Sequence, residues 1–362
     1  MQFGIASSSR ADSLLTTDLR YADSISDFPE QEIIFMKDRL TTPLVYHPAC
    51  TVLVDDNPRF LSTFRLQIRT RTPLHTFDSP LAALESLESQ ANAGPLEPAD
   101  ALRRLTDPKR FELYSTLIVD YDMPEMTGLD LCRKLAGRPI NRILLTGKAD
   151  ESHAVEAFNQ GLIHRFVRKG DPDVGERINR YLVELGWEYF RRLSSPHTLS
   201  EELDALDLFY TQSLARTLER LYADLRLVEH YYVAEPPGIL LMNAKGGVWL
   251  MLLLPQTEAK VHLEIAESEG APQALLQILE QGEQAAFFPS KDGYFRKDWA
   301  DDWRQYLYPA RTMEAVDGEE PCRYVLLERP AIPDALVEGI STFSDFRAAR
   351  RKSGSQSSSQ SG

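Results

Sequence analysis

The stretch LIVDYDMPEMTGLDL, residues 117–131, decides the fold of the first part of this 362-residue chain. Three apolar residues lead directly into Asp120, a run with Pro124 and Gly128 follows, and the pattern then becomes helical. This order is typical of a buried strand, a loop and a helix. Units of this kind build parallel sheets covered by helices.

Other segments repeat the pattern on both sides of this stretch. Short, mostly apolar runs predict buried parallel strands at Thr51–Val54, Thr116–Val119, Arg142–Leu145 and His164–Arg168. The polar residues that follow these runs at once are Asp55 and Asp56, Asp120, Thr146 and Lys169. Because the carboxyl ends of parallel strands meet at one edge, where ligands bind, we expect one shared site. Any single acid here also fits a helix cap or a turn, but the joint order favours a site.

These residue types suit the chemistry of phosphoryl groups. Three carboxylates in one pocket repel one another unless a cation lies among them. Oxygen ligands that are few and open to solvent suit Mg²⁺, and a carboxylate beside that ion can attack phosphorus. A lysine and a hydroxyl would neutralise the phosphoryl oxygens. Asp120, Mg²⁺, Lys169 and Thr146 therefore form a complete set for phosphoryl transfer.

With these residues in place, the segment from about 50 to 187 resembles the receiver domain of two-component response regulators, of the chemotaxis-regulator type. The motifs that carry the resemblance are VLVDDNP at 52–58, LIVDYDMPEMTGLDL at 117–131, ILLTGKAD at 143–150 and FVRKGD at 166–171. The resemblance implies an α/β fold with a doubly wound, five-stranded parallel sheet of the flavodoxin type, strand order 2-1-3-4-5. A smaller α+β domain would follow it.

The resemblance also implies a role for each acid. Asp120 would accept the phosphoryl group, from a sensor histidine kinase or a phosphotransfer protein. Asp55 and Asp56 would hold Mg²⁺ together with Asp120 and the backbone carbonyl of Asp122.

Three further residues would complete the switch that the resemblance implies. The Thr146 hydroxyl would turn toward the phosphoryl group, Phe166 would be the switch aromatic, and Lys169 would pair with the phosphoryl oxygens. Gly147 would leave the approach to the acceptor open. Gly170 departs from the family, in which a proline commonly follows the lysine. The signal would leave through the fourth and fifth receiver helices, and we expect a homodimer on that face.

Composition shifts predict five segments along the chain. They are an N-terminal extension at 1–48, the receiver domain at 49–187, a helical linker at 188–230, an α+β output domain at 231–345 and a disordered tail at 346–362. Leucines spaced by three, four or seven residues indicate a helical linker with two breaks, at Ser195–Pro196 and beyond Phe209. The sequence SGSQSSSQSG indicates the tail. The stretch 86–111 is longer than the family's usual connection by roughly a helix.

The output domain carries weaker signals. From residue 196 onward the chain has 16 basic and 26 acidic residues, a net charge of −10, and no basic helix behind a short glycine turn. We therefore expect no DNA binding. A hairpin at Gly246–Gly247 faintly resembles nucleotide cyclases of the GGDEF type, but Val248 and Trp249 stand where that family needs acids.

Alternatives for the output domain stay open. It is a PAS-like or similar small-molecule-sensing module, a degenerate nucleotide-cyclase-like module, or an unusual transcription regulator. An aromatic cluster between residues 287 and 308 favours a packed core over a partner surface or pocket. The arrangement also faintly resembles the uncharacterised extension of some quorum-sensing response regulators.

The composition of the whole chain bounds its partners and its location. A net charge of −14 disfavours nucleic acid, and the longest apolar run, Val248–Leu254, is too short for a membrane span. The N-terminus lacks the features of a secretory signal. Three scattered cysteines indicate a reducing, cytoplasmic location. We expect no enzymatic activity beyond autophosphorylation from small phosphodonors and autodephosphorylation.

Overall fold

The computed structural model describes residues 41–68, 73–90, 103–147, 151–194, 204–290, 292–329, 331–332 and 334–357. Contacts divide the chain into two units, Met1–Arg39 and Leu40–Gly362. Most of the predicted N-terminal extension lies outside the described residues.

The first sheet has five parallel strands. They are β2 (Cys50–Val54), β3 (Leu74–Phe77), β4 (Tyr114–Asp120), β5 (Asn141–Thr146) and β6 (Arg165–Arg168). Their order across the sheet is β3-β2-β4-β5-β6, and every neighbouring pair is parallel. This is the predicted order 2-1-3-4-5, so the flavodoxin-type fold is confirmed.

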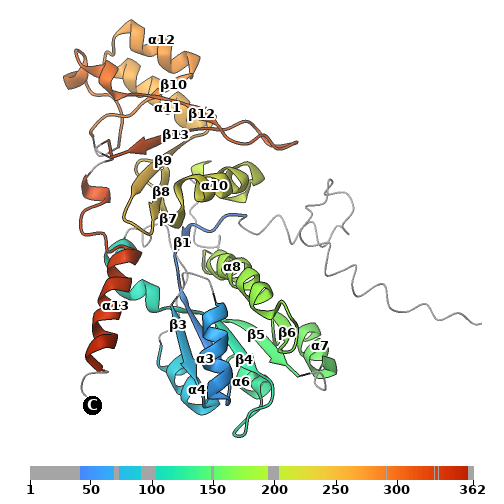
Figure 1. Cartoon of the computed structure of the whole chain (residues 1–362). Coiled ribbons are helices and arrows are strands. Elements are labelled where there is room, and N and C mark those ends of the chain that lie inside the picture. The colour runs from blue at the N-terminus through green and yellow to red at the C-terminus, as the bar shows by residue number, and fades with distance from the viewer. Residues whose placement is uncertain are drawn as a thin grey trace, which may run out of the picture. The chain divides into compact units, whose positions relative to one another are not determined.

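Helices cover both faces of this sheet (Figure 1). One face packs against α3 (Pro58–Gln67) and α8 (Val174–Leu193), and the other against α4 (Pro80–Ser89), α6 (Gly128–Lys134) and α7 (Glu151–Asn159). Alternation along β2 explains both layers, since Leu53 faces the first pair of helices and Val52 and Val54 face the second set.

Polar caps start the helices at the site edge. The Asn57 side chain accepts from the amides of Arg59 and Phe60, with Pro58 in the first turn of α3. Thr127 and Asp130 form a capping box on α6. Both caps fix where the loops after β2 and β4 end.

The second sheet has six strands in the order β1-β7-β8-β9-β13-β12, and every neighbouring pair is antiparallel. The strands are β1 (Val45–Tyr46), β7 (Leu227–Val233), β8 (Gly238–Asn243), β9 (Val248–Leu254), β12 (Arg311–Thr312) and β13 (Arg323–Glu328). A two-stranded sheet pairs β10 (Gln284–Ala286) with β11 (Leu307–Pro309).

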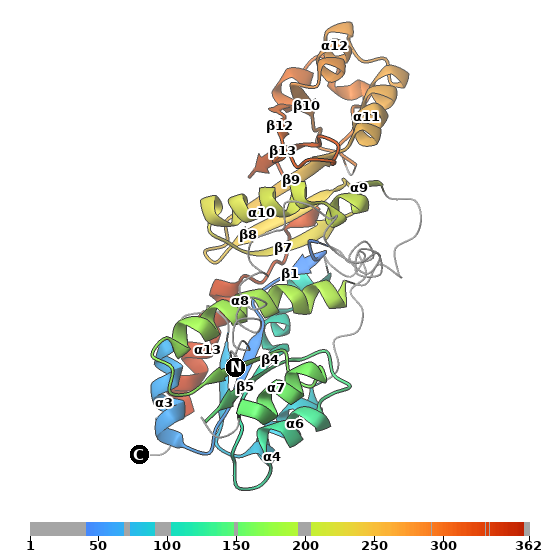
Figure 2. The same ribbon diagram turned by 90° about the vertical axis from the view of Figure 1, so that its right-hand side faces the viewer.

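The other elements of this half lie around these sheets, except α13, which lies beside the receiver (Figure 2). They are α9 (Asp204–Asp207), η6 (Leu208–Tyr210), α10 (Gln212–Leu225), α11 (Gln256–Ser268), α12 (Gln273–Gln281), η7 (Lys297–Trp299), η8 (Trp303–Tyr306), η9 (Asp334–Leu336) and α13 (Phe343–Ser357). A hairpin joins β8 to β9 through Gly246, whose φ is +85°. Glycine adopts this conformation without strain, so the predicted hairpin is present.

The predicted aromatic cluster forms a packed core. Phe288, Phe295 and Trp303 are buried together with Ala266 of α11 and Leu275 of α12. The stacked rings of Phe288 and Trp299 lie 5.4 Å apart. This part of the output domain therefore has a small hydrophobic core of its own.

Two predicted segments differ from the structure. The expected disordered tail is wrong for residues 346–357, because α13 continues to Ser357. Its anchors are Phe343 and Phe346, which pack on Phe111, a contact between residues far apart in the sequence. The helical linker also ends earlier than predicted, since β7 already begins at Leu227.

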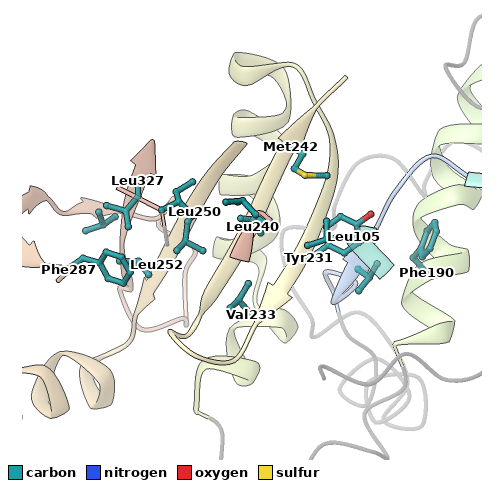
Figure 3. Close-up of a cluster of buried hydrophobic side chains, with 14 of the residues drawn as sticks. Leu105, Phe190, Tyr231, Val233, Leu240, Met242, Leu250, Leu252, Phe287 and Leu327 are labelled. Carbon is teal, nitrogen blue, oxygen red and sulfur yellow. The ribbon is translucent and has the colours of Figure 1, made fainter. Parts of the chain in front are cut away.

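A single hydrophobic core joins the receiver to the second sheet (Figure 3). Leu105 and Phe190, from the receiver side, are buried in one cluster with Tyr231, Leu240 and Leu250 of the second sheet, together with Leu252 and Leu327. Strand β1 adds to it, since Val45 pairs with Tyr231. The connection before β4 and the last turns of α8 are therefore part of the output domain's core. We call this cluster the shared core.

A buried ion pair lies beside the shared core. The Arg110 guanidinium lies 2.9 Å from a carboxylate oxygen of Glu229, and both side chains are almost fully buried. Arg110 also donates to the hydroxyl of Tyr231 and to the backbone carbonyls of Leu105, Asp107 and Ser341. Burying a charge is costly unless it is paired and hydrogen-bonded. Arg110 therefore ties the extended connection before β4 to the output sheet.

No helix in the described ranges is long and apolar enough to cross a membrane. The three cysteines are free and buried.

Candidate functional site

The predicted site residues meet at one edge of the parallel sheet. Asp55 directly follows β2, Asp120 and Thr146 end β4 and β5, and Lys169 follows β6. The exposed fraction of the residue is 0% for Asp55, 6% for Asp120 and 0% for Thr146. Burying a carboxylate is costly unless it is paired with a charge or a hydrogen-bond donor. Lys169 supplies that partner.

Lys169 is the centre of the site. Its ammonium nitrogen lies 2.6 Å from an oxygen of Asp55 and 2.8 Å from an oxygen of Asp120. Burial lowers the pKa of Lys169, but hydrogen bonds and charges from Asp120 and Asp55 outweigh it, so the pKa is raised. The lysine therefore stays protonated and neutralises part of the acidic pocket.

The pKa of Asp120 is raised. Burial is the largest cause, Lys169 works against it, and the charge of Asp55 adds to it. A carboxylate whose solvation is reduced in this way is a stronger nucleophile than one in open water.

Asp55 and Asp56 take different positions in the same loop. Asp55 accepts a hydrogen bond of 3.0 Å from the amide of Asn57, and that bond orients its carboxylate. Asp56 is exposed. Carboxylate oxygens of Asp55, Asp56 and Asp120 lie within 4.8 Å of one another. The predicted acidic triad is therefore assembled.

Gly128 lets the loop after β4 close tightly. A Cβ at this position would lie 2.1 Å from the carbonyl oxygen of Asp120, which no side chain tolerates. The Gly128 amide donates to the carbonyl of Tyr121, and the Tyr121 amide donates to the carbonyl of Leu145. These contacts hold Asp120 in place from both sides.

Thr146 and Phe166, the two predicted switch residues, lie in β5 and β6. The Thr146 hydroxyl oxygen is buried and makes no hydrogen bond to any described residue. A buried hydroxyl without a partner is costly, so an incoming acceptor would stabilise it. Phe166 is half-buried, with its ring edge-on to Phe158 at 6.4 Å.

One predicted role stays a prediction, and one residue near the site was not predicted. Asp122 lies in the loop between β4 and α6 with an exposed side chain, and the role of its carbonyl stays a prediction. Phe60 of α3, which the sequence did not single out, has its ring centroid 4.7 Å from the ammonium of Lys169. The sequence does show an aromatic residue in the first helical turn after the acidic pair. That this residue lies beside Lys169 follows only from the fold.

Comparisons with known proteins agree with this geometry. Residues 51–174 match the family model of the response regulator receiver domain. The solved structure of the response regulator LqsR from Legionella pneumophila is 27% identical; the match covers 86% of this chain and 96% of that one, with a TM-score of 0.74. A search of curated protein sequences gave no match.

Other solved structures are similar over a smaller share of the chain. An uncharacterised protein from Neptuniibacter caesariensis is 26% identical, covering 43% of this chain and 99% of that one, with a TM-score of 0.32. A response regulator receiver domain protein from Clostridium thermocellum is 18% identical, covering 38% of this chain and 93% of that one, with a TM-score of 0.30.

The fold, the site and the family match define residues 51–174 as a response regulator receiver domain. This places the chain in phosphorelay signalling. The likeness to LqsR covers most of the chain and thus continues beyond the receiver into the C-terminal half.

Proposed function

We propose that this protein is a response regulator that accepts a phosphoryl group on Asp120 from a histidine kinase or a phosphotransfer protein. The observation that carries the proposal is the ammonium of Lys169 between the carboxylates of Asp120 and Asp55, at 2.8 and 2.6 Å. An oxygen of Asp120 would bond to phosphorus while the bond from phosphorus to the donor's nitrogen breaks. The leaving imidazole takes up a proton, and Lys169 stays protonated to neutralise the phosphoryl oxygens.

The acidic triad fits a divalent cation. Its three carboxylates are all oxygen ligands within 4.8 Å of one another, and with one lysine they leave a charge of −2. Asp55, Asp56 and Asp120, with the carbonyl of Asp122, would hold Mg²⁺, which prefers such ligands. The ion would supply charge neutralisation during transfer.

The Thr146 hydroxyl, which has no hydrogen-bond partner in the described part of the chain, supports a switch. A phosphoryl group on Asp120 offers acceptors to that hydroxyl, and its movement leaves space beside Phe166. The change would reach α7 and α8, on which we propose that a second copy of the chain docks.

For the output half we propose a domain that does not bind DNA, since its net charge is −10 from residue 196 onward. We propose no enzymatic activity beyond the chain's own phosphorylation and dephosphorylation. The likeness to a response regulator over most of the chain supports signalling rather than metabolism.

Labelling of Asp120 tests the proposed function. The full chain with Mg²⁺ and phosphoramidate should gain one phosphoryl group by intact mass. Asp120→Asn should abolish this gain, because an amide is not a nucleophile toward phosphorus. Asp56→Ala should slow labelling and raise the Mg²⁺ concentration needed. Undiminished labelling of Asp120→Asn, or no labelling of the wild type, would overturn the proposal.

A further inference from the structure

Phe60 is the third neighbour of the Lys169 ammonium. The ammonium of Lys169 contacts the carboxylates of Asp55 and Asp120. Its third neighbour is the ring of Phe60, whose centroid lies 4.7 Å from the nitrogen. A cation within about 6 Å of a ring centroid is attracted by the negative face of the ring. The lysine is thus held by two charges and one aromatic face.

The ring is itself fixed in place. Phe60 lies in the first turn of α3, and its amide donates to the capping oxygen of Asn57. The ring stacks on Phe64, with centroids 5.0 Å apart and planes 15° from parallel. Phe64 is only 1% exposed and belongs to the core under α3. The aromatic face therefore has a rigid support that reaches into the core.

The lysine has less support from its own loop. Its four-carbon side chain loses rotamer freedom when the ammonium is placed. Gly170 follows it, and a Cβ there would meet nothing within 4 Å. Packing around Gly170 therefore does little to orient Lys169. The position of its ammonium is set instead by Asp55, Asp120 and Phe60.

We propose that Phe60 is a positioning residue for phosphoryl transfer, which it promotes by holding the Lys169 ammonium toward Asp120. This inference rests on the proposed function. When Asp55 shares its charge with a metal ion, its attraction for the ammonium weakens, whereas the ring of Phe60 binds no metal and keeps its attraction. The ring thus keeps the ammonium near the reacting oxygen of Asp120 when the carboxylates also bind a metal ion.

A double-mutant cycle with the full chain tests this role. Phe60→Leu keeps an apolar side chain but removes the aromatic face, and should slow phosphoramidate labelling at saturating Mg²⁺ about fivefold. Phe60→Tyr should restore the rate. In a Lys169→Ala background, Phe60→Leu should change the residual rate by less than about twofold. Leu66→Ala, on the same helix at an 83% exposed residue, is the control and should leave the rate unchanged.

A spectroscopic readout is independent of labelling. The ε-methylene protons of Lys169 should show an upfield ring-current shift by NMR that Phe60→Leu removes and Phe60→Tyr keeps. A slower rate that persists equally in the Lys169→Ala background would mean a merely structural effect and overturn the inference, as would an unchanged rate in Phe60→Leu. If the wild type is not labelled at all, the proposed function fails, and the inference about Phe60 fails with it even where the ring-current shift is present.

Discussion

His230 shows how completely single polar residues are enclosed where the two halves meet. One ring nitrogen lies 2.8 Å from the carbonyl of Pro43, to which it donates, and the other lies 2.7 Å from the hydroxyl of Tyr222, from which it accepts. The neutral imidazole satisfies both contacts. Tyr46 and Trp187 pack against the same ring. Burial lowers the pKa of His230 to about 4.

This lowered pKa predicts a loss of stability in mild acid. In the unfolded chain His230 titrates at its ordinary pKa of 6.5, so the unfolded state takes up the proton first. The contribution to stability is therefore complete above pH 6.5 and is lost as the pH falls toward 4, by about 3 kcal/mol in all. Urea titrations between pH 7.5 and 4.5 should show this loss. His230→Gln should reduce the slope, and equal slopes in the two proteins would contradict the assignment.

At the scale of elements, α8 serves two surfaces at once. Ile178 and Leu182 pack on the receiver sheet, and further along Tyr189 and Phe190 enter the shared core. On its outer side Val183 is 60% exposed. Helix α7, on the other face of the receiver sheet, exposes Val155 by 43% and Phe158 by 39%. The exposed apolar side chains of α7 are suited to a symmetric contact with a second copy.

We predict dimerisation on this surface when the acceptor is occupied. Beryllofluoride, which stands in for the phosphoryl group on Asp120, should shift the sedimentation of the full chain toward a dimer in the presence of Mg²⁺. Val155→Glu should block the shift by placing like charges across the two-fold axis, without loss of Asp120 labelling. Thr146→Ala should reduce the shift, and Leu66→Glu is the matched surface control. Equal dimerisation with and without beryllofluoride would refute the switch.

The elements also show what the sequence could and could not predict. Strands β2, β4 and β5 were predictable because each is a buried apolar run with a polar residue at its end. The residues of β3 do not predict a strand, since LHTF at the sheet edge has no continuous apolar run. Its existence followed only from the family resemblance.

Contacts between distant residues set the limit of the sequence-based predictions. Strand β1 has two residues, and Val45 pairs with Tyr231 far along the chain, so no local pattern marks it. Helix α13 also depends on a contact between distant residues, because its first turns pack against Phe111. In the site, the acids and the lysine were predictable from their strand ends, whereas Phe60 depended on how α3 crosses the loop after β6.

At the scale of the whole molecule, charge and coverage both disfavour nucleic acid. The net charge is −14. Buried clusters cover both faces of the six-stranded sheet. Two basic residues of α13 contact the protein itself, since Arg350 pairs with His75 and Arg347 lies over the ring of Phe343.

We therefore predict that the full chain, phosphorylated or not, shows no sequence-specific DNA affinity. Fluorescence anisotropy with a random DNA library at 150 mM salt should give dissociation constants weaker than about 10 µM, because few phosphates could be neutralised. Selection of a defined sequence that binds at nanomolar concentration would contradict the prediction and favour a transcription regulator.

The shared core also limits how this regulator can have evolved. Where a receiver and its effector are joined by a loose tether, recombination can exchange one partner without regard to the other. Here an incoming receiver would have to bring Phe190 at the end of its last helix and a segment equivalent to the one around Leu105, or leave Tyr231 facing water. Inheritance of the two halves as one block is the expected result, and diversification would then proceed by paired substitutions across their boundary.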